Sequence, residues 1–239
     1  MNKLIYFILT ISIFSCSNID QNAVEIINDS ISQQQIDSIL TEFKFEYDDL
    51  IFVDSSSQVL LPITTRLNTR SKSYGKDGNL SDEYARFWNI IFYNSSSYQT
   101  RLLTESKIRI EDLSVNIQNA GQIIKNSILY IIGDIDYNAD TKIDYQDPVH
   151  LFISEIDGTK LKRISPENEN LKSYKIVPNT DKIIYQTIRD IDNNLVFDRF
   201  DEQIWYMIDL GKNEKSLEIV DSLDRKKIEN LYFEQWLKK

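Results

Sequence analysis

The fold is decided by residues 151–165, LFISEIDGTKLKRIS. An apolar run rich in Ile and Phe is followed by Asp157-Gly158 and by a shorter run that ends at Ile164. An Asp-Gly pair tolerates the positive φ of a tight turn, and β-branched and aromatic residues favour strands. The stretch therefore predicts a β-hairpin, and the rest of the domain is expected to be built from similar hairpins.

Paired apolar runs rich in Ile, Val, Phe and Tyr recur along the chain, as strands do. They occupy residues 50–53 with 59–63, 88–93 with 101–103, 128–132 with 151–156, and 183–187 with 204–210. Phe52, Phe92 and Tyr130 lie about 40 residues apart, and the longer interval to Tyr185 contains an acidic insertion. A period of about 40 residues is that of a β-propeller blade. We predict an all-β fold, a propeller-like array of about four β-hairpin blades with a C-terminal helix, and a β-sandwich is the alternative.

The same stretch also resembles a known repeat. In the TolB-type propeller repeats a strand, an Asp-Gly turn and a Leu-Thr-like ending recur, and residues 151–165 are similar to this blade unit. Residues 174–185, YKIVPNTDKIIY, resemble the next segment of the repeat, although Val177 and Thr180 depart from its Ser-Pro-Asp-Gly turn. The resemblance covers residues 125–212 and implies a propeller.

The N-terminus predicts export. Lys3 is followed by apolar residues 4–14, small residues and Cys16, the layout of a cleavable signal. This run is too short to span a membrane, which takes about 20 residues. Residues 13–16, Ile-Phe-Ser-Cys, resemble the lipobox of bacterial lipoproteins, which implies a diacylglycerol on Cys16 and an amide-linked acyl chain such as palmitate. An ordinary signal peptide with an accidental cysteine is the alternative.

Cys16 is the only cysteine of the chain, so no internal disulfide can form, and a lipid thioether explains the residue better than redox chemistry does. We therefore predict a lipid-anchored membrane protein of the bacterial cell envelope, at the outer membrane or its periplasmic face.

Four segments are expected. Residues 1–15 form the signal peptide, 16–46 a lipidated tether, 47–212 the β domain and 213–239 a C-terminal helix. The tether is rich in Asn, Gln and Ser and ends in a weak helix over residues 32–43. Asp221 or Ser222 can cap the C-terminal helix, which runs to about Leu237. The apolar residues of this helix are expected to pack against the domain, and an exposed stripe could instead serve a partner: Leu223, Ile228, Leu231, Tyr232 and Trp236.

Two acidic segments carry the strongest chemical signal. Residues 136–147, DYNADTKIDYQD, fit a twelve-residue EF-hand-like loop, with oxygen side chains at positions 1, 3, 5, 9 and 12 and an aliphatic residue at position 8. Residues 190–201, DIDNNLVFDRFD, repeat the pattern. The predicted ligands are Asp136, Asn138, Asp140, Lys142, Asp144 and Asp147, and then Asp190, Asp192, Asn194, Val196, Asp198 and Asp201, with Lys142 and Val196 acting through their carbonyl oxygens. We predict a structural Ca²⁺ in each loop.

Both loops depart from the EF-hand pattern. Position 6 is Thr141 or Leu195 instead of Gly, and position 12 is Asp instead of Glu. Pro148 also prevents a helix from continuing directly after the first loop. We therefore expect a calcium loop that links two strands of one blade. A merely solvated acidic turn is the alternative.

Composition limits the function. A formal net charge of −10 argues against nucleic acid as a partner, because such binding rests on Lys and Arg. A single histidine, His150, and no spare cysteine exclude the usual zinc sites, and no nucleophile-elbow motif is present. Strand alternation around His150 predicts a surface or edge position.

We predict a cell-envelope binding or scaffold module that is not an enzyme, whose partner is an unknown envelope protein or glycan. The alternatives are an envelope hydrolase that cleaves glycans with carboxylates and a calcium sensor.

Overall fold

The computed structural model of the chain describes residues 46–64, 87–212 and 215–238. The predicted signal peptide, Cys16, the helix expected over residues 32–43 and nearly all of the tether lie outside the described residues. Among the helices that are described, none combines the length and the apolar character needed to cross a membrane.

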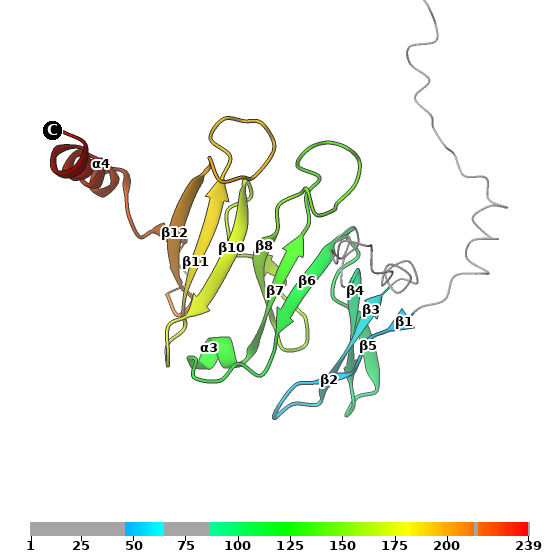
Figure 1. The fold of residues 1–239 in the computed structure, drawn as a ribbon. Coiled ribbons are helices and arrows are strands. Elements are labelled where there is room, and N and C mark those ends of the chain that lie inside the picture. The colour runs from blue at the N-terminus through cyan, green and yellow to red at the C-terminus, as the bar shows by residue number, and fades with distance from the viewer. Residues whose placement is uncertain (1–45, 65–86, 213–214, 239) are drawn as a thin grey trace, which may run out of the picture. The chain divides into compact units, whose positions relative to one another are not determined.

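The fold is mostly β and consists of three antiparallel sheets (Figure 1). The described strands do not close into a barrel or a propeller. The first sheet contains β1 (Glu46–Tyr47), β2 (Ile51–Phe52), β3 (Gln58–Thr64), β4 (Asn89–Asn94) and β5 (Gln99–Leu102). The second contains β6 (Arg109–Ser114), β7 (Ser127–Gly133), β8 (His150–Glu155) and β9 (Lys162–Arg163). The third contains β10 (Glu169–Ile176), β11 (Lys182–Arg189), β12 (Glu202–Asp209) and β13 (Leu217–Glu218).

All four predicted strand pairs are confirmed, as β2 with β3, β4 with β5, β7 with β8, and β11 with β12. The prediction that each pair belongs to a separate unit is wrong for the first two. β3 is long enough to pair with β1 and β2 along one edge and with β4 along the other, where Leu60 lies opposite Phe92. The chain therefore builds three sheets from the four pairs.

The hairpin over residues 151–165 is confirmed as β8, a tight turn and β9. Gly158 adopts φ +76°, and its N–H donates to the carbonyl oxygen of Glu155 at 2.9 Å. The Asp157 carboxylate accepts from the N–H of Thr159 at 2.8 Å. Phe92 of the first sheet lies so close that a Cβ on Gly158 would come within 2.5 Å of its ring. The turn therefore requires glycine for both its φ angle and its neighbour.

The core lies on both faces of the second sheet. Tyr130 and its neighbours Ile128 and Ile132 are buried against first-sheet residues such as Phe92. Leu129, which points to the opposite face, is buried against third-sheet residues such as Tyr185. The second sheet is thus enclosed between the other two.

Two short helical segments complete the described fold. α3 (Gln122–Lys125) precedes β7. α4 (Ser222–Tyr232) begins at the predicted cap, Asp221, whose side chain accepts from the N–H groups of Leu223 and Asp224, and η2 (Phe233–Leu237) continues it. β13 lies before α4, within the segment predicted to be helical only.

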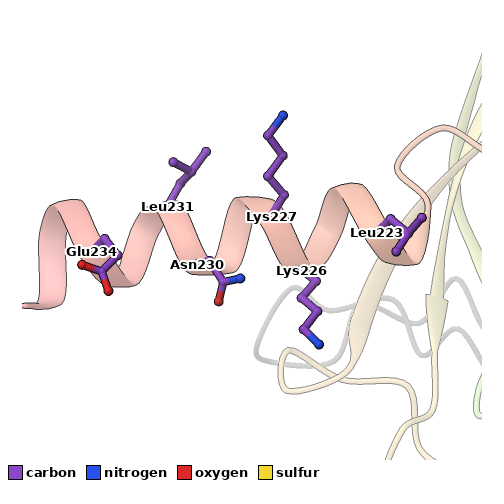
Figure 2. Close-up of a pocket in the computed structure, with 6 residues that line it drawn as sticks. All are labelled: Leu223, Lys226, Lys227, Asn230, Leu231 and Glu234. Atoms are coloured by element: carbon purple, nitrogen blue, oxygen red, sulfur yellow. The ribbon is translucent and has the colours of Figure 1, made fainter.

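The prediction that the C-terminal helix packs against the domain is wrong. No residue of α4 or η2 is buried, and Leu223 and Trp236 are 78% and 75% exposed. Arg225 forms ion pairs with Glu202 and Glu218, so the first turn is attached to the third sheet by charge and not by apolar contact. A shallow groove between Leu223 and Glu234 is lined by side chains of α4 and η2 alone, which Figure 2 labels.

We expect Gly158→Ala to lower the free energy of unfolding by at least about 1 kcal/mol, because a left-handed backbone costs roughly that much for a residue with a Cβ and the methyl group meets Phe92. Gly211→Ala is the matched control, since its new Cβ would lie 3.3 Å from one carboxylate oxygen and its φ is not positive. Denaturant unfolding measures both. Equal losses in the two variants would contradict the assigned role of the turn.

Candidate metal centre

The two acidic segments occupy equivalent places in successive sheets. The first loop, residues 136–147, connects β7 with β8, and the second loop, residues 190–201, connects β11 with β12. In each sheet these are the second and third strands in chain order. Both loops emerge at the same end of the sheets (Figure 1). Each loop therefore links two strands of one sheet, and the binding of calcium by these loops stays a prediction.

Position 1 organises the first half of each loop. The Asp136 carboxylate accepts from the backbone N–H groups four and five residues later, at 3.0 and 2.8 Å. Asp190 does the same at 3.3 and 3.0 Å. The chain thus wraps around the first carboxylate in both loops.

Position 12 closes each loop. The Asp147 carboxylate accepts from the N–H groups of positions 2 and 9, at 2.8 and 2.9 Å. Asp201 repeats this pattern at 3.1 and 2.9 Å. Both side chains belong to buried residues, so the two ends of each loop are held together by one carboxylate in a protected position.

The backbone turns sharply at positions 4 and 6. Thr141 and Leu195, which stand where the EF-hand pattern has Gly, adopt φ +74° and +64°. Ala139 and Asn193 at position 4 adopt φ +59° and +58°. A left-handed backbone costs roughly 1–2 kcal/mol for residues such as Ala139, Thr141 and Leu195, whereas Asn tolerates it. The loops therefore keep the sharp turn without glycine.

One cluster of carboxylates could hold a metal ion. Asp190, Asp192 and Asp201 each offer an oxygen within 4.8 Å of the others, and no other such group of acidic, His or Cys side chains occurs among the residues that the structure describes. Ligand oxygens lie about 2.3–2.6 Å from Ca²⁺, so two of them on one ion are separated by up to about 5 Å. In the first loop position 3 is Asn138, whose amide oxygen replaces the third carboxylate.

The remaining predicted ligands do not all converge. Asp140 and Asn194 at position 5 accept from the N–H groups of Lys142 and Val196, at 2.9 and 2.7 Å. Their oxygens are thereby directed to the loop backbone. The position 9 carboxylates, Asp144 and Asp198, accept from the N–H groups two residues later, at 2.9 and 2.7 Å.

A contact that the sequence did not predict joins the two loops. The Tyr137 hydroxyl of the first loop donates to the Asp190 carboxylate of the second at 3.3 Å, and its ring lies 5.0 Å from that of Phe197. Burial and the negative charges of Asp190 and Asp201 raise the pKa of Tyr137. The first loop therefore contacts the carboxylate that organises the second.

A buried carboxylate lies beneath the second loop. Glu169 is 4% exposed and accepts from Arg189 at 2.8 Å, from Tyr206 at 3.0 Å and from Thr187. Arg189 also reaches Glu218 at 3.0 Å. Burial alone would lower the pKa of Arg189, but the two glutamates outweigh it and raise that pKa. Sequence reasoning missed this network because β10 is largely polar and has no apolar run.

An arginine lies beneath the first loop as well. Arg109 is buried, pairs with Glu111 and donates to the carbonyl oxygen of Asp147 at 3.4 Å. Burial lowers the pKa of Arg109, and the charges of Asp147 and Asp144 act in the opposite direction.

The prediction that His150 is a surface or edge residue is wrong. It is completely buried because the second sheet is covered on both faces, so strand alternation does not separate solvent from core. Its Nδ1 lies 2.7 Å from Asp134, which also pairs with Arg163 at 2.7 Å, and its Nε2 lies 2.9 Å from the carbonyl oxygen of Glu167. Burial alone would raise the pKa of Asp134, but His150 and Arg163 lower it.

No family model matches the chain, and no curated protein matches it.

Arg189→Met is expected to lower the free energy of unfolding by about 3–5 kcal/mol, because it leaves the buried Glu169 carboxylate without its cation. Adding Glu169→Gln should recover part of the loss. The control, Arg225→Met, removes a guanidinium whose partners are more exposed and should cost about 1 kcal/mol or less. Denaturant unfolding compares them, and equal losses would disprove the assignment of Glu169 as a buried charge that depends on Arg189.

Proposed function

We propose that the protein is a lipid-anchored component of the bacterial cell envelope whose β domain is a calcium-stabilised binding module. The observation that carries the proposal is the repetition of one hydrogen-bonding pattern, position by position, in two loops of different sequence.

Calcium is the ion that the donor chemistry favours. At its predicted side-chain ligand positions each loop offers four aspartates and one asparagine, all oxygen donors, and neither loop contains sulfur or imidazole. Hard cations prefer such ligands, and Ca²⁺ accepts a flexible shell of 6–8 oxygens, whereas Mg²⁺ demands a smaller octahedral one. An exported protein meets abundant calcium, which favours a permanent structural ion over a sensor.

For the fold we propose an open array of three propeller-like blades. Two features support this. The second and third sheets share one strand order, a four-stranded meander, and successive sheets share their cores face to face. These are the features of propeller blades. The resemblance of residues 125–212 to TolB-type repeats agrees with this proposal.

Binding is favoured over glycan hydrolysis by the state of the carboxylates. A hydrolase of this kind needs one carboxyl group that gives up a proton and one that attacks or activates water. Glu169 is surrounded by three donors, and the loop aspartates accept backbone N–H groups. These interactions commit the carboxylates to structure, so we propose a protein that is not an enzyme.

We expect calcium to raise the melting temperature of the protein, because the ion binds the native loops and not the scattered carboxylates of the unfolded chain. The gain for one site is about 2.7 kcal/mol at a hundredfold excess over the dissociation constant. Asp136→Asn with Asp140→Asn should reduce the rise, Asp190→Asn with Asp192→Asn should reduce it too, and all four together should abolish it. Magnesium should substitute poorly.

The readout is the difference in melting temperature between calcium and chelator, so that any change in the metal-free protein cancels. Glu155→Gln with Glu234→Gln removes the same number of charges from exposed positions outside the loops and is the control. If chelator leaves the unmutated protein unchanged and calorimetry detects no calcium binding at millimolar concentration, the loops are solvated turns.

For the anchor, we expect a fatty-acid analogue supplied during growth to label the protein through Cys16. Cys16→Ser should abolish the label and leave an unprocessed or released chain, because the thiol is the group that accepts the diacylglycerol. Labelling that persists in Cys16→Ser would end the lipoprotein interpretation.

A further inference from the structure

A polar cavity of about 450 Å³ lies beside the second loop. Its walls come from three parts of the chain: Tyr137 of the first loop, Asp190 and Asn193 of the second, and residues 166–169, which lead into β10. Arg189, the last residue of β11, completes the lining. The volume falls within the range of about 300–1,000 Å³ typical of small-molecule pockets.

The charged groups of this pocket already have partners. Arg189 is paired with Glu169 and Glu218, so it offers no free charge to an anion. Glu167 pairs with Arg163 at 3.1 Å. The Asp190 carboxylate accepts from two backbone N–H groups and from Tyr137. An anionic ligand would therefore find no free cation. Among the carboxylates of this lining, Asp190 has no ion-pair partner and is assigned to the metal site, so a neutral polar ligand fits better.

The unused hydrogen-bonding capacity lies in amide groups. In the part of the chain that the structure describes, the side-chain amides of Asn168 and Asn193 are exposed and form no hydrogen bond within the protein. Each amide has both donors and an acceptor, which match the donor and acceptor character of a hydroxyl group. Pro166 and the Tyr137 ring add apolar surface to the same lining. A ligand that carries hydroxyl groups on an apolar ring matches both the hydrogen-bonding amides and the apolar surface of this lining.

The wall that carries Asn168 is held in place from below. The buried imidazole of His150 contacts the carbonyl oxygen of Glu167 at 2.9 Å, and Arg163 holds the Glu167 side chain. Asp134 fixes both His150 and Arg163. The residues that sequence reasoning left without a role thus preorganise one side of the pocket, which lowers the entropy lost on binding.

We propose that this pocket binds a neutral, hydroxyl-rich ligand, a small saccharide, through Asn168 and Asn193 with the sugar ring against Tyr137 and Pro166. The assignment rests on the proposed binding function and specifies its ligand class.

The test is isothermal titration calorimetry of the purified full chain with four neutral disaccharides, maltose, cellobiose, lactose and N,N′-diacetylchitobiose. Glucosamine and glucose 6-phosphate are the cationic and anionic probes. At least one neutral sugar should bind, and both charged probes should bind more weakly. Asn168→Ala should weaken binding about tenfold, the loss expected for the hydrogen bonds of one amide. Asn230→Ala, an exposed amide on α4, should leave binding unchanged.

Melting temperatures show whether Asn168→Ala is folded, and Asn168→Asp, which keeps the shape and adds a charge, provides a second variant that should also weaken binding. Absence of binding by all four sugars, tighter binding of a charged probe, or full affinity in both Asn168 variants would each overturn the assignment. Calcium stabilisation without sugar binding refutes this inference alone, whereas sugar binding without a calcium response refutes the metal proposal alone.

Discussion

The central strand of the second sheet, β7, has no face open to solvent, and the rest of the structure depends on this constraint. Alternate residues of β7 belong to different cores, since Tyr130 is buried against the first sheet and Leu129 against the third. The second sheet is shielded from solvent only when both cores form. It therefore lies between the first and third sheets, so that the sheets follow one another in chain order. Equivalent strand ends then come together, and the long connections meet there, as the contact between Tyr137 and Asp190 shows.

Each loop contains four aspartates. The second and third sheets each place a guanidinium beneath the loop, but on different strands. Arg109 begins β6 and lies opposite Gly133, whose missing side chain leaves room for it. In the third sheet the equivalent pair is Glu169 opposite Arg189, so the cation stands on the second strand instead of the first. In both sheets a positive charge thus lies beneath the acidic loop, carried by the first strand in one sheet and by the second strand in the other.

The sequence predicted features that depend on local patterns. The four strand pairs, the Asp157-Gly158 turn, the helix cap at Asp221 and the acidic loops follow from strand propensity, turn chemistry and spacing. Features that depend on contacts between distant parts of the chain were not predicted from the sequence. His150 is buried because a neighbouring sheet covers it, and Glu169 lies in a polar strand whose partners are distant in sequence. The first two hairpins form one sheet because β3 pairs along both of its edges, with β2 and with β4. The apolar pattern of a single strand does not show that it pairs on both sides.

The two loops share a backbone but differ in charge balance. Arg109 donates to a carbonyl oxygen of the first loop itself, and Lys107 reaches the carbonyl oxygen of Thr141 at 3.3 Å. In the third sheet Arg189 pairs with Glu169 and Glu218, whereas Arg109 pairs with Glu111. Among the described residues, the second loop is the one that brings three carboxylates within 4.8 Å of one another. A cation there would fix Asp190, and through Asp190 the hydroxyl of Tyr137, so an ion in the second loop would also fix the pocket wall that both loops build.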